Sequence, residues 1–88
     1  MTINEWKDTL RGESFSHVYV QRDAPHVFYP DHQHENVTAH IILEGEMAIT
    51  VDGKTKTFKV GERFDVPAGT IHAAKMGLNG CTYLIGEK

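Results

Sequence analysis

The chain contains 88 residues, and its 9 basic residues are outnumbered by 12 acidic ones, which gives a formal net charge of −3 at pH 7. This balance, without any basic run, excludes a nucleic-acid-binding protein, and no apolar stretch is long enough to span a membrane. A chain of this length forms one domain with a small core, so a bound metal ion or a partner subunit would add stability.

The only cysteine is Cys81, so an internal disulfide is impossible. A single unpaired cysteine is typical of proteins in a reducing compartment. The N-terminus also lacks the apolar core of a secretory signal peptide. We therefore expect a cytoplasmic protein.

Residues 1–14 are expected to form a short helix or, alternatively, a loosely docked arm. Ile3, Trp6 and Leu10 recur at helical spacing. Thr2 or Asn4 is a suitable N-cap, and Gly12 is a suitable end for the helix.

Residues 15–86 have a pattern that is typical of strands. Short runs rich in β-branched and aromatic residues alternate with turn signals, of which Asp52-Gly53 is the clearest because this pair favours the type I′ turn of a hairpin. Many short strands with almost no helix indicate an all-β protein, built as an antiparallel sandwich or barrel. The expected strands span residues 15–21, 27–29, 37–43, 47–51, 55–60, 63–66, 71–76 and 82–85. The turns expected between them are at residues 23–25, 30–31, 44–46, 52–53, 61, 67–69 and 77–80.

Four histidines have positions that suit a metal site. His32 and His34 are two residues apart, so in an extended segment their side chains project from the same face. His40 has the same parity further along, and His72 follows the turn Pro67-Ala68-Gly69. Imidazoles gathered in this way are common ligands of divalent transition metals.

The stretch from residue 26 to residue 76 resembles the cupin superfamily, whose members are small β-barrels of jelly-roll topology. The resemblance implies a single cupin domain over residues 1–88, with the helix or arm at 1–14 and a jelly-roll barrel at 15–86. The residues that match the two motifs of that family are His32, His34 and Gly45 in the first, and Gly61, Pro67, Gly69 and His72 in the second.

Three positions depart from the family pattern. His26 stands where the first motif begins with glycine, and Met76 stands where the second ends with asparagine. Thr38 occupies the position of the family's metal-binding glutamate, and a hydroxyl is a poorer ligand for a divalent ion than a carboxylate. His40 lies two residues beyond Thr38 on the same face and is a candidate replacement.

The candidate metal ligands are therefore His32, His34, His40 and His72. They form either a four-histidine site or a three-histidine site in which His40 only lines the pocket. A set of neutral imidazoles suits Zn, Fe, Ni or Cu, with Mn less favoured, and does not suit Mg or Ca. We expect one divalent transition metal ion.

The pocket beside this ion is expected to be mostly apolar, with walls from Phe28, Ile42, Ala74, Met76 and Tyr83. Such a pocket suits a small organic molecule that touches the metal through oxygen. The resemblance implies a mononuclear metalloenzyme of dioxygenase, isomerase or lyase type. The alternative is a non-catalytic module that binds or senses a small molecule or a metal, because a fold alone does not decide function.

We also expect a homodimer. Trp6, Phe15 and Tyr19 offer apolar surface near the N-terminus for a second copy to cover. Small cupins commonly pair sheet to sheet, so the resemblance implies the same assembly.

Overall fold

Helix α1 (Ile3–Gly12) opens the chain in the computed structural model, which describes residues 1–88. The Thr2 hydroxyl accepts a hydrogen bond from the Glu5 backbone N–H (3.1 Å), and the Glu5 carboxylate accepts one from the Thr2 N–H (2.8 Å). This capping box fixes the start of the helix at Thr2, one of the two candidate caps. Of the two expectations for residues 1–14, the helix is the one observed, and it is too short to cross a membrane.

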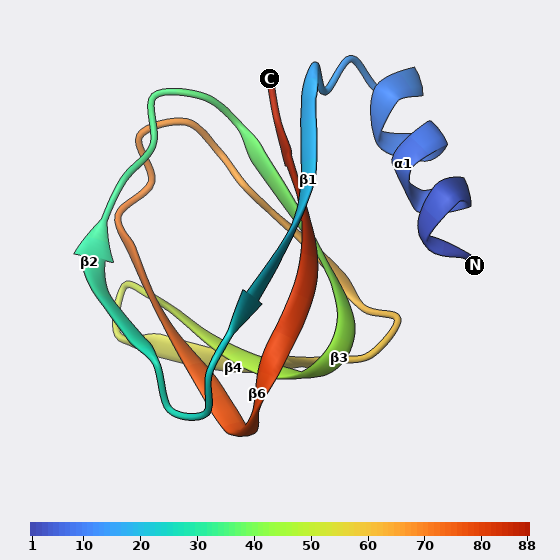
Figure 1. The fold of residues 1–88 in the computed structure, drawn as a ribbon. Helices are drawn as coiled ribbons and strands as arrows, with labels where there is room; N and C mark the ends of the chain where they lie inside the picture. Colours follow the sequence, from blue (N-terminus) through green and yellow to red (C-terminus); the bar gives the residue numbers. More distant parts are fainter.

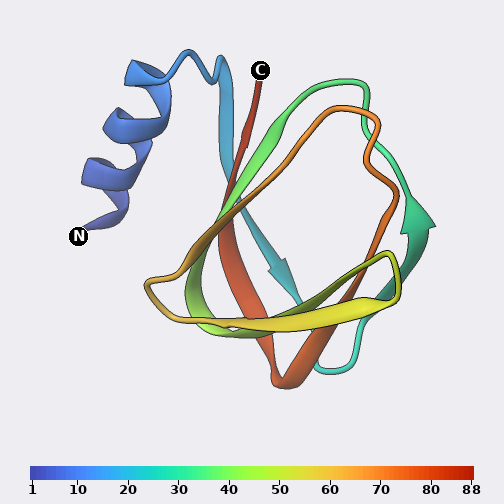
Figure 2. The ribbon, with the colours of Figure 1, turned by 180° about the vertical axis from the view of Figure 1, so that it is seen from behind.

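Six strands follow the helix and form one antiparallel sheet that curls into a barrel, with α1 outside it (Figures 1 and 2). The strand order is β1-β6-β3-β4, while β2 pairs with β6 and β5 pairs with β3. The predicted all-β barrel with a short N-terminal helix is therefore confirmed. The strands are β1 (His17–Asp23), β2 (Phe28–His32), β3 (Thr38–Val51), β4 (Lys54–Lys59), β5 (Arg63–Val66) and β6 (His72–Glu87).

Two of these strands are much longer than the sequence predicts. β3 continues through Glu44-Gly45-Glu46, and β6 continues through residues 77–80, although both segments are predicted as turns. Those two turn predictions are wrong because register shifts on either side of Gly45 bend the strand pair without ending it. Gly45 and Gly80 adopt φ values of +73° and +77°, which glycine reaches without steric cost.

Smaller differences concern the other predicted boundaries. Pro30 and Asp31 are predicted as a turn but belong to β2, where they fall in a register shift between two paired residues, Tyr29 and His32. Proline lacks an N–H to donate, so it is tolerated where the ladder is interrupted. The hairpin at Asp52-Gly53 is as predicted, with positive φ at both residues (52° and 74°) between the paired ends of β3 and β4.

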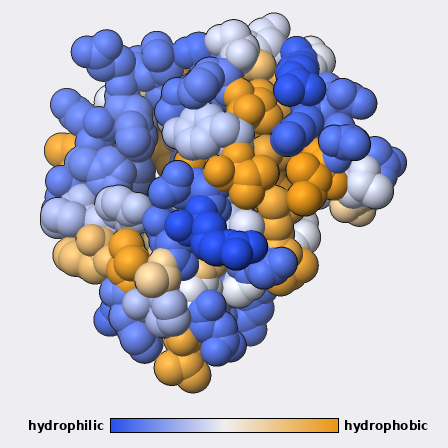
Figure 3. All heavy atoms as spheres, viewed as in Figure 1, coloured by the Kyte–Doolittle hydropathy of each residue, from blue (hydrophilic) through white to orange (hydrophobic).

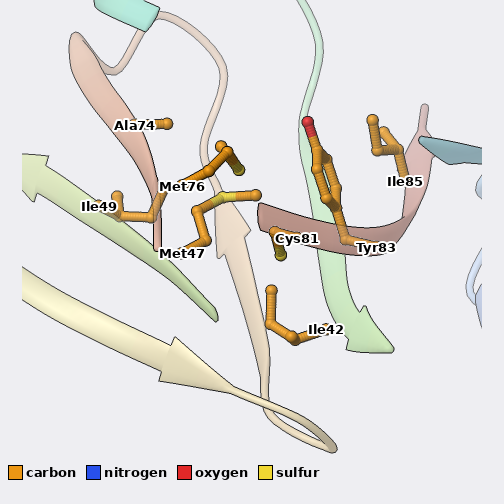
Figure 4. Packing of buried hydrophobic residues seen from close by; sticks show 8 residues of the cluster. All are labelled: Ile42, Met47, Ile49, Ala74, Met76, Cys81, Tyr83 and Ile85. Carbon is orange, nitrogen blue, oxygen red and sulfur yellow. The ribbon is translucent and has the colours of Figure 1, made fainter. Parts of the chain in front are cut away.

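Successive strand residues point alternately into and out of the barrel, and this separates two hydrophobic clusters. Ile42 belongs to the inner cluster, whereas its neighbour Ile41 belongs to the outer one. In Figure 4, Met47 of β3 and Met76 of β6, which are paired in register, lie against each other inside the barrel. The inner cluster comprises Ile42, Met47, Ile49, Ala74, Met76, Cys81, Tyr83 and Ile85.

The outer cluster fixes helix α1 on the sheet. Leu10 of the helix is fully buried together with Ile41 and Leu84 of the two central strands. At the end of the helix, both terminal nitrogens of Arg63 donate to the Glu13 carboxylate, at 2.8 and 2.7 Å. This bidentate ion pair connects the segment after α1 to β5. The helix is therefore held on the sheet both by apolar packing and by an ion pair.

Substitution of Gly45 tests why β3 can continue past residue 45. A Cβ added at Gly45 would overlap the backbone carbonyl of Gly80, whereas one added at Gly53 would meet nothing within 4 Å, although φ is nearly the same at the two positions (+73° and +74°). Gly53→Ala should lower the unfolding free energy by about 1–2 kcal/mol, the cost of a left-handed backbone for alanine. Gly45→Ala should cost about 1–3 kcal/mol more, because overpacking is added to that strain.

Chemical denaturation of the two glycine variants beside the wild type measures this difference. Equal losses of stability at the two positions would show that the close approach of β3 to β6 at Gly45 does not constrain the fold.

Assembly stays a prediction. One of the residues on which the prediction rests is not available to a partner, because Phe15 is buried in the outer cluster, and Tyr19 is half-buried with its side chain at the cavity of the barrel. Other apolar side chains gather over β1 and its border with α1 (Figure 3). On these two elements, Val20 and Ile3 are each 44% exposed.

We expect a homodimer formed through the outer face of β1. Sedimentation at about 30 µM should give twice the 9.9 kDa chain mass if the Kd is near 1 µM. Val20→Glu should produce monomer, because a charge at the centre of a buried patch is costly. Leu78→Glu is the control, since Leu78 is exposed in another strand, β6. A monomeric wild type at this concentration would contradict the prediction.

Candidate metal centre

Three of the four predicted ligand residues lie together at one end of the β2–β6 pair. His32, the last residue of β2, is paired in register with His72, the first residue of β6. His34 follows two residues later, in the loop that leads to β3. The ring centroids are 4.2 Å apart for His32 and His72, 5.0 Å for His32 and His34, and 5.2 Å for His34 and His72.

One ring nitrogen from each of these histidines lies within 4.8 Å of the other two, a group that could hold a metal ion. The loop of the second predicted motif is held against that of the first, because the Gly69 N–H donates to the His34 carbonyl at 2.9 Å. The two loops are therefore fixed relative to each other by backbone, before any ion binds.

Backbone carbonyls orient two of the rings. Nδ1 of His32 lies 2.8 Å from the Pro30 carbonyl oxygen, and Nδ1 of His72 lies 2.9 Å from that of Thr70. A carbonyl oxygen only accepts, so Nδ1 carries the proton in both rings and Nε2 keeps its lone pair. Metal-binding histidines typically donate from their second nitrogen in this way. The residues present therefore fit a divalent transition metal.

The third ring is also kept in the form that binds metal. The pKa of His34 is lowered, first by burial and then by the neighbouring His32 and His72. A lower pKa keeps the imidazole neutral, and only the neutral ring has a lone pair to offer to an ion.

His40 is not a member of this group. Its ring stacks on Phe64, with centroids 4.5 Å apart and planes at 7°. Burial, followed by the nearby His72 and His34, lowers its pKa to about 4. Its Nδ1 is buried without a hydrogen-bond partner, as is the hydroxyl of Thr38, the residue at the expected glutamate position.

A cavity of about 310 Å³ opens beside the three histidines, inside the barrel. Of the predicted walls, Ala74 and Tyr83 line it, together with Met47 and Ile49. The prediction for Phe28 is wrong, because this side chain is 58% exposed on the outside of the barrel. The other residues at the cavity are Tyr19, Gln21, Tyr29, His32, His34, Thr38, His40, Phe64, His72, Ile85 and Glu87.

Ile42 and Met76 were also predicted as walls, but both belong to the inner cluster and do not line the cavity. The parity that placed them on the inner face is correct. Their depth along the barrel depends on how the strands cross, and a pattern of alternation does not contain that information.

The sequence did not indicate a buried carboxylate beside the cavity. Asp23 was assigned to a turn, but it ends β1 and is only 8% exposed. It accepts hydrogen bonds from the hydroxyls of Tyr83 (2.6 Å) and Tyr29 (3.0 Å) and from the amide of Gln21 (3.1 Å). Tyr19, Gln21 and Asp23 are spaced two residues apart, so they share one face of the strand, and this spacing is the sequence signal that indicates an inward-facing Asp23.

This network fixes two of the polar groups that face the cavity. The hydroxyl protons of Tyr29 and Tyr83 point at Asp23, so toward the cavity their oxygens can only accept. Burial, together with hydrogen bonding to Asp23, raises the pKa of both tyrosines. At neutral pH they therefore stay protonated.

A histidine triad that could hold a metal ion therefore lies at one side of a small antiparallel barrel. Residues 19–77, which include all three histidines, match the family model described as a Cupin domain, and the chain belongs to that family. The predicted resemblance is thus confirmed. A comparison with curated proteins gave no match.

Several solved structures share the fold. A cupin-2 domain protein from Shewanella frigidimarina superposes with a TM-score of 0.70 at 22% identity, over 80% of this chain and 67% of that one. KdgF from a Halomonas species gives 0.67 at 18%, over 81% and 67%. The DMSP lyase DddQ from Ruegeria pomeroyi gives 0.73 at 25%, over 81% of this chain, which spans only 36% of DddQ.

The pKa of His40 predicts how the stability of the metal-free protein depends on pH. An unfolded chain takes up a proton on this residue near pH 6.5, whereas the folded protein does so only near pH 4. The stabilising contribution of neutral His40 is therefore complete above pH 6.5 and is lost as the pH falls toward 4. The shift corresponds to an unfolding free energy on the order of 3 kcal/mol.

Denaturant titrations in the presence of a chelator, at several pH values between 7 and 4, measure this dependence. His40→Gln should show a shallower fall than the wild type, because glutamine does not titrate. Identical profiles for the two proteins would mean that His40 is charged in the folded state at the same pH as in the unfolded chain.

Proposed function

We propose that this protein binds one divalent transition metal ion through His32, His34 and His72 and presents it to a small organic molecule in the adjoining cavity. The observation that carries the proposal is the pair of hydrogen bonds from the Nδ1 atoms of His32 and His72 to backbone carbonyls, which leaves an unprotonated nitrogen on each ring. Three neutral imidazoles favour Zn, Fe, Ni or Cu, with Mn less favoured.

The residues around the triad have distinct tasks in this proposal. A divalent ion supplies positive charge that polarises an oxygen of the bound molecule. The phenolic oxygens of Tyr29 and Tyr83 accept hydrogen bonds from donors on that molecule, because their own protons are committed to Asp23. Apolar contacts from Met47 and Ile49 exclude water from the remainder of the cavity. His40 lines the cavity as a neutral ring and is not a metal ligand.

The reaction class that we propose is that of a mononuclear metalloenzyme of the dioxygenase, isomerase or lyase type. One of the structurally similar proteins is a DMSP lyase, so this barrel supports lyase chemistry in at least one relative. A cytoplasmic location completes the proposal, since the buried thiol of Cys81 is unpaired, as expected in a reducing compartment.

A second candidate is a non-catalytic module that binds a small molecule or senses a metal. The pKa values favour it in one respect. The pKa of His40 is lowered to about 4 and the pKa values of Tyr29 and Tyr83 are raised, so none of these groups changes its protonation state near pH 7. Oxygen uptake by the iron-loaded protein and product formation by the metal-loaded protein, both screened with small hydroxy and carboxylic acids, separate the candidates. Saturable ligand binding without any turnover would favour the module.

Metal analysis of single variants tests the triad itself. The purified protein should contain one transition metal ion per chain. His34→Ala should weaken metal affinity by more than the roughly 10–100-fold that loss of a ligand's hydrogen-bond partner costs, since it removes a bond to the ion. His40→Ala should retain the metal at wild-type affinity, and His17→Ala, which changes an exposed histidine of β1, is the control.

Two results would decide against parts of the proposal. A wild-type protein that binds none of these metals in competition titrations would rule out the metal site. Equal losses of affinity in His34→Ala and His40→Ala would instead restore the four-histidine site, with His40 as its fourth ligand.

A further inference from the structure

Thr38 gives the site a hydroxyl in place of a carboxylate ligand. It stands where the family pattern has a metal-binding glutamate, and its hydroxyl is buried without a hydrogen-bond partner. The residue directly opposite Thr38 in the β3–β6 register is Glu87. A carboxylate residue therefore lies opposite Thr38 on the neighbouring strand.

The side chains of Glu87 and Thr38 are on the same side of the sheet. Residues directly opposite each other in an antiparallel pair project from the same face, with Cβ atoms about 4.5–5.5 Å apart. Tyr83, Ile85 and Glu87 alternate along β6, and all three line the same cavity as Thr38 and the histidine triad. Glu87 thus projects into the cavity from a position next to Thr38.

The backbone of Glu87 is held from two sides. Its carbonyl accepts from the Ser16 N–H at 3.1 Å, and the next residue, Lys88, donates to the Val37 carbonyl at 3.2 Å. Its carboxylate is held by one contact, from the Tyr19 hydroxyl at 3.3 Å. Hydroxyl hydrogen bonds usually measure about 2.5–3.0 Å, so this contact is weak. The backbone of Glu87 is therefore fixed, whereas its carboxylate has only this one weak hydrogen bond.

Glu87 and the histidine triad line the same cavity. In the structure, Glu87 lies outside the group of ligand atoms that are within 4.8 Å of one another.

We propose that Glu87 is the carboxylate ligand of this metal site and takes the place of the glutamate that Thr38 replaces. It would leave the Tyr19 hydroxyl and turn to an ion held by His32, His34 and His72, so the inference depends on the metal binding proposed above. A carboxylate in the donor set lowers the net charge at a divalent ion and makes the site more suitable for oxygen-preferring metals such as Mn.

Glu87→Gln is the variant that tests this ligand, with Glu35→Gln as its matched control. Glutamine keeps the size of the side chain and an oxygen that accepts from Tyr19. Glu35 is exposed, follows His34 in the chain and does not line the cavity, so Glu35→Gln removes the same charge near the site without removing a possible ligand. Competition titrations with Mn²⁺ and Zn²⁺, and the visible spectrum of the Co²⁺-loaded protein, are the measurements.

Glu87→Gln should weaken Mn²⁺ binding by about tenfold or more and change the Co²⁺ spectrum, because a ligand is lost. Glu35→Gln should leave the spectrum unchanged and alter the affinity far less. Thr38→Glu should restore Mn²⁺ affinity in the Glu87→Gln background. In the otherwise wild-type chain it should add little, because the carboxylate position is already filled.

The possible failures are distinguishable. A wild-type protein that binds no metal contradicts the proposed function. A wild type that binds metal while Glu87→Gln has the same affinity and spectrum contradicts only the role of Glu87, as do equal effects of the two glutamine variants. If Glu87→Gln does not fold, Thr38→Glu alone decides, because clearly tighter Mn²⁺ binding by that variant would mean that the wild-type site lacks a carboxylate.

Discussion

The backbone pairing of β6 is the constraint on which both the barrel and its site depend. This strand is hydrogen-bonded to β1, β2 and β3, so it connects most of the sheet. Its first residue, His72, is placed opposite His32 by pairing with β2, and its last residue, Glu87, is placed opposite Thr38 by pairing with β3. Ladder hydrogen bonds fix these register positions, and a metal site requires its ligands to be held in a defined geometry.

Neutral imidazoles are the electrostatic condition for such a site. Burial lowers the pKa of His34, and backbone carbonyls hold the Nδ1 protons of His32 and His72. The same burial would make a charged histidine costly, so it favours the neutral form of the imidazole, which is the form that can bind a metal ion.

The other side of the cavity is organised differently. Asp23 is a buried acceptor with three donors around it, and it commits the protons of Tyr29 and Tyr83. A buried carboxylate is tolerated when its oxygens are satisfied in this way. The cavity therefore has histidine nitrogens on one side and phenolic oxygens that can only accept on another, and this asymmetry would orient a bound molecule.

The sequence by itself determined the class of fold, the hairpin at Asp52-Gly53 and a set of four candidate histidines that contains the three that meet, because these depend on local spacing and on two motifs with fixed intervals. It left open whether residues 1–14 form a helix or an arm, and the structure decided for the helix. The tertiary structure decided which turn signals became bulges, since Gly45 bends β3 only where Gly80 of β6 approaches it. It also decided that His40 stacks on Phe64 outside the triad, that Asp23 is buried, and that Glu87 faces Thr38. Each of these depends on the register between strands distant in sequence, and the alternation within a strand carries no information about that register.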